Sequence, residues 1–420
     1  MQPKLVTPNL KYKNNNLFFE EVEIERLVEN FGTPLYVYSK NQIVKNFNNY
    51  KQALADRNHL ICYAVKANTN YSIIKIIKEL GGGADVTSYG ELWRVLKVGV
   101  EPKKIVFAGV GKNEEEIKFA IKNKILLINV ESKDEVDLIN KVAKRNVDVA
   151  IRVNPEINTY TITHISTGEE GVKFGIPIKD VIDFAKYIKE RCKKINLIGL
   201  HFHIGSQICN IKPFVEATKK VVKIFNILKN LGFDIRYIDV GGGLGIKYKD
   251  EEPPTPQTLF SKLKKIIPKD VTIICEPGRY IVGNAGILVC KVLYHKKVRN
   301  KNFLIVDASM TDLIRPTFYG AYHNVIPVII SNHSKMITCD IVGPVCETSD
   351  FLAKNRTVVD VENGGLLVIE TTGAYGFVMS SNYNSRLRPA EVMVDNDSFY
   401  LIRKREIFND LIEKEIYEKN

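Results

Sequence analysis

An alternation of short apolar runs with longer amphipathic segments extends from residue 60 to residue 281. The amphipathic segments, such as YSIIKIIKELG at 71–81, carry apolar residues at the spacing of one helix face and often end at glycine. The apolar runs, rich in β-branched residues, predict eight strands: Leu60–Val65, Ala84–Thr87, Ile105–Ala108, Ile125–Val130, Val147–Val153, Leu197–Ile204, Tyr237–Val240 and Val271–Cys275. Eight strand–helix units in this length fit a closed (β/α)8 barrel of the TIM type better than an open sheet.

The pattern changes after residue 281. Segments such as AGILVCKVLYHKKV, NFLIVDAS, KMITCDIVGP and AEVMVD are strand-like, with turn residues between them and little sign of helix. They predict a separate antiparallel β domain, either a barrel or a sandwich, in the C-terminal part. We therefore expect an α/β protein with its barrel at 36–281 and a β domain made of 1–35 and 282–420.

Length and composition agree with such a protein. A chain of 420 residues is long enough for two domains, and its hydrophobic fraction of 45% and charged fraction of 26% are typical of a soluble globular protein. No stretch approaches the roughly 20 apolar residues of a membrane span. The N-terminal segment MQPKLVTPNLKYKNNN lacks the apolar core of a signal peptide, so we expect a cytoplasmic protein.

The cysteines and the net charge narrow the functional classes. Seven cysteines are scattered without a CxxC pair, which argues against a disulfide framework and against a zinc knuckle. The net charge of +12 comes from lysines spread over predicted helix faces and not gathered in one patch. A solvated, lysine-rich surface that also suits an anionic small-molecule substrate is therefore favoured over a nucleic-acid partner.

Functional residues of a TIM-type barrel lie at the carboxyl ends of its strands. Residues that suit catalysis or binding recur at these ends. They are Lys66 after the first strand, Asp85 in the second, Arg152 in the fifth, His203 and Ser206 after the sixth, Gly242 and Gly243 after the seventh, and Glu276 and Arg279 after the eighth. A single lysine behind an apolar strand has usually just reached solvent. A partly desolvated lysine can instead form a Schiff base. Because several other residues of this kind also lie at the carboxyl ends of strands, a catalytic role is favoured for Lys66.

Two further motifs indicate which chemistry. The GGGLG run at 241–245 could be only a tight turn, but TIM-type barrels often bind phosphate after strands seven and eight, where glycines let backbone N–H groups approach. His201 and His203 face the same side of a strand, yet no clear third ligand accompanies them, which disfavours a metal site. A lysine, a phosphate cradle, an acidic residue and a flat imidazole together describe a site for pyridoxal 5′-phosphate. Glu276 suits the ring nitrogen of this cofactor, and His203 suits its ring face.

Seven motifs occur in order along the chain: YAVKAN, HFHIGSQ, DVGGGLG, CEPGR, GPVCETSD, GAYG and YNSRLRPAEV. In these motifs the sequence resembles the diaminopimelate decarboxylases. They are barrel-type pyridoxal-phosphate decarboxylases, a group that also includes ornithine and arginine decarboxylases. The resemblance runs from about residue 34 to residue 395, and seven ordered motifs make it specific.

The resemblance implies a role for each matching residue. Lys66 would form the Schiff base and His203 would stack on the cofactor, which Asp85, Arg152, Ser206, Gly242, Gly243, Glu276, Pro277, Gly278, Arg279 and Tyr375 would surround. Arg279, Arg315, Tyr319, Glu347 and Tyr375 would hold the substrate. The family also implies a homodimer with shared active sites, in which Cys346 and Glu347 reach the other subunit's barrel.

The implied reaction is decarboxylation of meso-2,6-diaminopimelate to L-lysine and CO₂, the last step of lysine biosynthesis. After the loss of CO₂ a proton must return to the same carbon, and the resemblance implies Cys346 as its donor. A buried structural thiol is the commoner fate of a cysteine. The setting GPVCETSD, with Glu347 adjacent, favours catalysis.

Three other functions compete with this one. A decarboxylase for ornithine, arginine or a related precursor is the nearest rival, but a simple diamine precursor needs no arginine at its distal end, where the resemblance puts Arg279 and Arg315. An alanine racemase would place an arginine beside the ring nitrogen, where this chain offers Glu276. A catalytically inactive binding protein on the same fold is disfavoured by the intact Lys66, Glu276 and Cys346.

Overall fold

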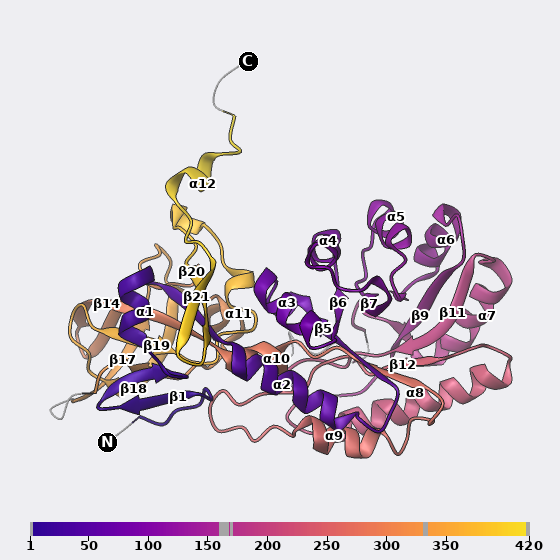
Figure 1. Cartoon of the computed structure of the whole chain (residues 1–420), viewed down its shortest axis with the longest axis horizontal. Coiled ribbons are helices and arrows are strands. Elements are labelled where there is room, and N and C mark those ends of the chain that lie inside the picture. Colours follow the sequence, from indigo (N-terminus) through magenta and orange to yellow (C-terminus); the bar gives the residue numbers. More distant parts are fainter. Residues whose placement is uncertain (1–2, 159–167, 169–170, 331–334, 417–420) are drawn as a thin grey trace. The chain divides into compact units, whose positions relative to one another are not determined.

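A computed structural model describes residues 3–158, 168, 171–330 and 335–416, and the chain divides into two compact units. One unit, the barrel unit, comprises Val44–Ile246 and Glu252–Ile281. The other, the β-rich unit, comprises Met1–Ile43, Lys247–Glu251 and Val282–Asn420. Figure 1 shows the elements of each unit along the chain.

Eight parallel strands form the wall of the barrel unit. Their order is β5-β6-β7-β8-β9-β11-β12-β13, and pairing of β13 with β5 closes the ring. The predicted (β/α)8 barrel is confirmed, with each expected strand in place. The strands are β5 (His59–Ala64), β6 (Gly83–Val86), β7 (Ile105–Phe107), β8 (Leu127–Val130), β9 (Val147–Asn154), β11 (Ile195–His201), β12 (Tyr237–Asp239) and β13 (Thr272–Cys275), and the short β10 (Ile176–Pro177) pairs with β9.

A helix follows each strand of the barrel, one further helix precedes the first strand, and most consecutive helices contact the next helix along the chain. Figure 1 shows them outside the strands that they connect. They are α2 (Lys40–Ala53), in which the boundary between the units falls, α3 (Tyr71–Glu79), α4 (Tyr89–Val98), α5 (Glu114–Asn123), α6 (Lys133–Val142), α7 (Val181–Arg191), α8 (Lys212–Asn230), α9 (Pro256–Leu263) and α10 (Arg279–Val282). Single 3₁₀ turns in the barrel unit are η1 (Val65–Ala67), η2 (Pro102–Lys104) and η4 (Ile178–Asp180). Those in the β-rich unit are η5 (Gly283–Ala285), η6 (Phe377–Met379) and η7 (Tyr383–Ser385).

Local sequence defines where α4 and α5 begin, after the short loops that follow β6 and β7. The side chain of Ser88 accepts a hydrogen bond from the backbone N–H of Glu91 and so caps the start of α4. The same helix ends at Gly99, whose φ of 84° lies in the left-handed region that glycine tolerates best. Asn113 and Glu116 form a reciprocal capping box at the start of α5. Such sharply defined helix starts hold the residues that precede them close to the strand ends.

The β-rich unit contains two sheets and short helices. A three-stranded sheet has the order β1-β2-β3, and a nine-stranded sheet has the path β18-β17-β15-β14-β4-β20-β21, with β16 and β19 beside it. The elements are β1 (Leu10–Lys13), β2 (Asn16–Phe19), β3 (Val22–Glu23), α1 (Ile24–Phe31), β4 (Leu35–Ser39), β14 (Gly286–Val298), β15 (Lys301–Val306), α11 (Arg315–Tyr319), β16 (Val325–Pro327), β17 (Met336–Val342), β18 (Phe351–Val359), β19 (Leu366–Ile369), β20 (Ala390–Asp395), β21 (Ser398–Arg403) and α12 (Phe408–Ile412).

The β-rich unit differs in detail from the expected antiparallel domain. Most of its pairs are antiparallel, but β15 pairs with β17 and β4 with β20 in parallel. The pairing of β4 also places residues 36–39, expected in the barrel, in the sheet of this unit. The strand is apolar or aromatic up to Ser39 and entirely buried, so its sequence suits either unit. One core joins its side chains with those of α1, β14, β19 and β20.

Among the helices that the structure describes, none is long and apolar enough to cross a membrane.

Candidate active site

Lys66 pairs with a buried carboxylate at the ends of the first two barrel strands. It lies in η1, directly after β5, and its Nζ is 2.9 Å from Oδ2 of Asp85 in β6. The Asp85 side chain is fully buried, whereas 37% of the Lys66 side chain is exposed. Burial raises the pKa of Asp85 to about 6, Glu276 adds to the rise, and Lys66 opposes it. The lysine is thus an accessible amine whose partner lies in the barrel interior.

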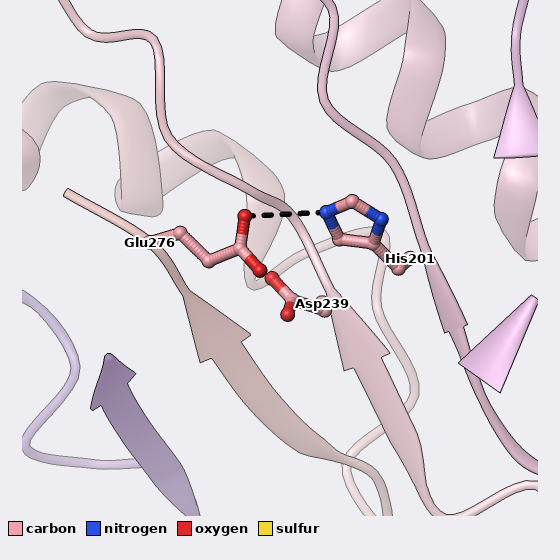
Figure 2. A group of neighbouring side chains, drawn as sticks. All are labelled: His201, Asp239 and Glu276. Atoms are coloured by element: carbon pink, nitrogen blue, oxygen red, sulfur yellow. Dashed lines mark hydrogen bonds and ion pairs between the residues drawn. The ribbon is translucent and has the colours of Figure 1, made fainter. Parts of the chain in front are cut away.

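His201, Asp239 and Glu276 form a second, wholly buried group (Figure 2). They come from the ends of β11 and β12 and from the residue after β13. Nε2 of His201 lies 3.2 Å from Oε2 of Glu276. Each of the three residues has one nitrogen or oxygen atom that could coordinate a metal ion, and these three atoms lie within 4.8 Å of one another. Burial alone would raise the pKa of Glu276, but His201, Lys66 and Asp239 lower it below its usual range. Glu276 is therefore an anion, as its predicted place beside a protonated ring nitrogen requires.

His203 is a neutral imidazole in this site. Burial lowers its pKa well below the usual range, and Lys66 and Arg152 lower it further. Its Nδ1 accepts a hydrogen bond of 3.2 Å from the backbone N–H of Gly242. The contact joins the loop after β11 to the glycine turn after β12, and it fixes which ring nitrogen carries the proton. A neutral, fixed imidazole suits contact with the face of a flat ring.

The glycine turn at 241–243 brings three backbone segments together. A Cβ atom at Gly242 would lie 2.2 Å from the carbonyl oxygen of Glu276, and one at Gly243 would lie 2.3 Å from that of Gly205. Gly243 also has a φ of 104°, which L side chains rarely adopt. The approach of the loops after β11, β12 and β13 thus depends on glycine. Glycine-rich turns of this kind can present backbone N–H groups to a phosphate, which is the role predicted for this one.

The loop after β13 also contacts the loop after β5. The carbonyl of Pro277 accepts a hydrogen bond of 3.2 Å from the N–H of Ala64. A Cβ at Gly278 would lie 3.0 Å from the methyl groups of Ala64 and Ala67, which flank Lys66 closely in sequence. Arg279 donates from Nη2 to Oγ of Ser206 over 3.0 Å. These contacts bring the first, sixth and eighth strand ends together, as predicted.

Arg152, whose charge acts on His203, has a partner that the sequence did not reveal. Its Nη1 is 3.1 Å from Oε1 of Glu131, and both side chains are buried. Glu131 also accepts a hydrogen bond of 2.9 Å from the N–H of Gly175. Glu131 follows β8, so its place at a strand end was the signal that could have identified it. Asp239 was missed in the same way, because it reads as the first residue of the glycine motif.

The remaining predicted residues belong to the β-rich unit. Arg315 opens α11 and is buried, and its Nη1 lies 2.9 Å from Nε2 of His323. Tyr319 ends α11 and is half-buried. Tyr375 is half-buried and has a φ of 56°, in the left-handed region. Their predicted contacts with substrate or cofactor remain predictions.

Cys346 and Glu347 lie on an exposed turn between β17 and β18. The backbone N–H of Cys346 donates to Oδ1 of Asn384 over 2.8 Å, and Oε1 of Glu347 accepts from the hydroxyl of Tyr383 over 3.0 Å. Cys346 is a free, exposed thiol. The alternative of a buried structural thiol does not apply, and its role as a proton donor remains a prediction.

Comparison with known proteins gives one consistent family. Residues 40–283 match the pyridoxal binding domain of the pyridoxal-dependent decarboxylases. A diaminopimelate decarboxylase of Aquifex aeolicus is 48% identical over 415 residues, which cover 98% of each chain. The structure of a Helicobacter pylori diaminopimelate decarboxylase complexed with L-lysine superimposes with a TM-score of 0.89 at 42% identity, covering 93% of this chain and 98% of that one. A diaminopimelate decarboxylase from M. jannaschii in complex with L-lysine has a TM-score of 0.92 at 37% identity and 99% coverage of both chains.

Proposed function

Because this chain belongs to the diaminopimelate decarboxylases of the pyridoxal-dependent decarboxylase family, we propose that it converts meso-2,6-diaminopimelate to L-lysine and CO₂. The meso substrate has one D and one L centre. A product of L configuration keeps the L centre, so the carboxylate must leave from the D centre. The reaction completes lysine biosynthesis.

The residues of the barrel fit pyridoxal 5′-phosphate. They combine an accessible amine on Lys66, a buried anion on Glu276, a neutral imidazole on His203 and a glycine turn where Cβ atoms would collide with backbone. When bound, the cofactor supplies a ring that accepts the electrons left behind by the departing carboxylate. The observation that carries the proposal is the Lys66 amine, which lies 2.9 Å from Oδ2 of buried Asp85 at the carboxyl end of β5.

Each barrel residue then has a defined task. Lys66 anchors the cofactor through its amine, and Asp85 positions that amine. Glu276 keeps a proton on the ring nitrogen, because a buried anion stabilises the adjacent positive charge. His203 would pack against the ring, and the glycine turn with Ser206, Gly278 and Arg279 would surround the phosphate and the substrate.

The second part of the proposal concerns the residues that bind substrate, most of which belong to the β-rich unit. Arg315 and Arg279 bind substrate carboxylates, with Tyr319 and Tyr375 beside them, and Glu347 binds the distal amine. Cys346 returns a proton to the carbon that has lost CO₂. The family resemblance supports a homodimer in which Cys346 and Glu347 act at the partner's barrel, and their exposure on one turn agrees with contact outside their own unit. Seven free thiols agree with the reducing cytoplasm that we propose as its location.

The direct test is to incubate the purified protein with pyridoxal phosphate and meso-diaminopimelate, and to measure CO₂ and lysine together. Equal amounts of both products are expected. Lys66→Ala serves as the inactive control, and ornithine serves as the substrate that lacks a distal carboxylate. Turnover of ornithine at a comparable rate, or absence of lysine, would contradict the assigned substrate.

A further inference from the structure

Glu276 needs to remain ionised although it is completely buried. We propose that Asp239 is a positioning residue for Glu276: it is an un-ionised carboxylic acid in the folded protein, and its O–H donates a hydrogen bond to Glu276. Asp239 thereby keeps the neighbouring carboxylate ionised and in place. The inference rests on the proposed function only for the role of Glu276 beside the cofactor ring, and not for the state of the carboxyl pair itself.

Strand register brings the residues together. His201 ends β11 and aligns with Asp239 at the end of β12, while Asp239 aligns with Ile274 of β13, two residues before Glu276. Figure 2 shows the Asp239 carboxyl facing the Glu276 oxygen that His201 does not contact. All three side chains are buried, so bulk solvent screens the interactions between them only weakly.

Hydrogen bonding identifies a missing proton. Oε2 of Glu276 has His201 as its partner, and Oδ1 of Asp239 accepts a hydrogen bond of 2.9 Å from the N–H of Gly241. The other two oxygens, Oδ2 of Asp239 and Oε1 of Glu276, are buried and find no partner among the residues that the structure describes. Buried polar atoms are rarely left unpaired, because this costs free energy. A single proton between the two carboxyls would make one oxygen a donor and the other an acceptor.

Electrostatics favour the same arrangement. Two carboxylates that share a buried site cannot both ionise readily, so the pair holds one proton and the pKa of one member rises. Burial raises the pKa of Asp239 well above its usual range, and Glu276 raises it further. The groups that interact electrostatically with the carboxyl pair are His201 on β11, His203 after β11, Cys62 on β5, Asp85 and Lys66 at the ends of β6 and β5, and Cys275 on β13.

The surroundings decide which carboxyl keeps the proton. Glu276 has the His201 N–H and the nearby Lys66 charge to stabilise an anion. Asp239 has one backbone N–H, from Gly241, and Asp85 is a further negative neighbour. The proton therefore belongs to Asp239. Because Gly241 opens the glycine turn, Asp239 also ties the ring-nitrogen carboxylate to the loop that surrounds the phosphate.

The experiment compares Asp239→Asn with Asp239→Ala in the holoenzyme. Asparagine keeps the acceptor for Gly241 and replaces the O–H donor with an N–H donor, so a neutral donor at this position is preserved. We expect kcat of Asp239→Asn to stay within about threefold of wild type, and kcat of Asp239→Ala to fall by about 10- to 100-fold with little change in KM. If the role of Asp239 were purely structural, two variants that are both shown to fold would have similar kcat values.

Infrared spectroscopy provides a readout that does not depend on turnover. The C=O stretch of an un-ionised carboxylic acid lies at a higher frequency than the bands of carboxylates and amides. We expect this band in wild type at about pH 8.5, far above the ordinary pKa of an aspartic acid, and its loss in Asp239→Asn. Asp312→Asn is the matched control, because Asp312 is also buried but its pKa of about 7 leaves it ionised at that pH. Removal of Asp312 should leave the band unchanged.

Three results would overturn the inference. One is a spectrum in which Asp239→Asn removes no acid band. Another is a folded Asp239→Asn protein that is as slow as Asp239→Ala, since an ionised or proton-exchanging Asp239 would then be needed. The third is a stoichiometric metal ion in purified wild type that Asp239→Asn lacks, because the same three donors would then be ligands. If Asp239→Ala fails to fold, Asp239→Asn and the infrared band still decide. If diaminopimelate is not a substrate, the band still reports on the carboxyl pair.

Discussion

His323 accepts a hydrogen bond from Arg315, and the geometry allows no other assignment. Nε2 of His323 lies 2.9 Å from Nη1 of Arg315, and its Nδ1 lies 2.8 Å from the carbonyl oxygen of Glu370. A carbonyl only accepts and a guanidinium only donates, so Nδ1 carries the proton and Nε2 does not. The Arg315 guanidinium is further bounded by the ring of Tyr248, 4.7 Å from its centre. Arg315 is thus held in one orientation by a buried, neutral histidine.

Substitution of His323 should weaken substrate binding through Arg315. His323→Leu removes the acceptor, and we expect KM for diaminopimelate to rise by about 10-fold or more while kcat changes less. His323→Gln retains an amide oxygen as acceptor and should recover part of the loss. Steady-state kinetics of both variants, with thermal unfolding as a check on the fold, provide the measurement. Equal KM values for both variants and wild type would show that substrate binding does not depend on the positioning of Arg315 by His323.

Replacing Lys66 should remove the covalent anchor. Lys66→Ala should lose nearly all turnover and keep its fold, because the side chain is partly exposed and Asp85, whose pKa is already raised to about 6, can take up a proton when it loses this partner. Borohydride reduction of the wild-type holoenzyme followed by peptide mapping should label Lys66. Lys75→Ala, on the exposed face of α3, is the matched control and should retain activity. A label on any other lysine contradicts the assignment.

Neutralising Glu276 should separate chemistry from binding. An amide cannot stabilise a protonated ring nitrogen, so Glu276→Gln should slow decarboxylation by several orders of magnitude without a comparable loss of cofactor affinity. Absorbance of the bound cofactor gives its occupancy, and CO₂ release gives the rate. Near-normal turnover would mean that another group keeps the ring protonated.

Mixing two inactive variants tests the shared site. Lys66→Ala and Glu347→Ala should each be nearly inactive. If Glu347 acts at the partner's barrel, a mixed dimer has one site with both lesions and one site with neither. Random reassortment of equal amounts should then restore about a quarter of wild-type activity, provided that the two sites are independent. If no activity is restored although a tagged subunit confirms exchange, Glu347 and Lys66 of each active site must come from the same subunit.

The pH dependence of stability should carry a contribution from Asp85. Its pKa is raised to about 6 in the folded cofactor-free protein, from an ordinary value of 3.8. The folded state therefore binds more protons than the unfolded chain between these values, and the free energy of unfolding falls as pH rises through this window. The full effect is about 3 kcal/mol. Asp85→Asn stays neutral, so urea unfolding of this variant across the window should show a smaller decline; an unchanged slope would contradict the raised pKa.

The sequence alone determined the barrel and most of the residues at its mouth. Eight apolar runs, each separated from the next by a helical segment, leave few arrangements in which every strand is buried. The residue that follows each run then marks the carboxyl end of a strand. Lys66, Glu276 and the glycine turn could be placed in one site for this reason. Strands β18 and β21 were missed, because FLAKNRTVV and SFYLIR mix polar and apolar residues and β21 has no fully buried residue.

Only the tertiary structure decided the partners of these residues. The structure shows that strands and loops place Asp239 beside Glu276 and Glu131 beside Arg152. It also places His323 beside Arg315. The parallel pairing of β4 with β20 joins segments separated by about 350 residues, which no local pattern specifies. Hydrogen bonds and pKa shifts depend on distance and burial in space. Periodicity in the sequence shows which face of an element is buried, but not which charge lies opposite.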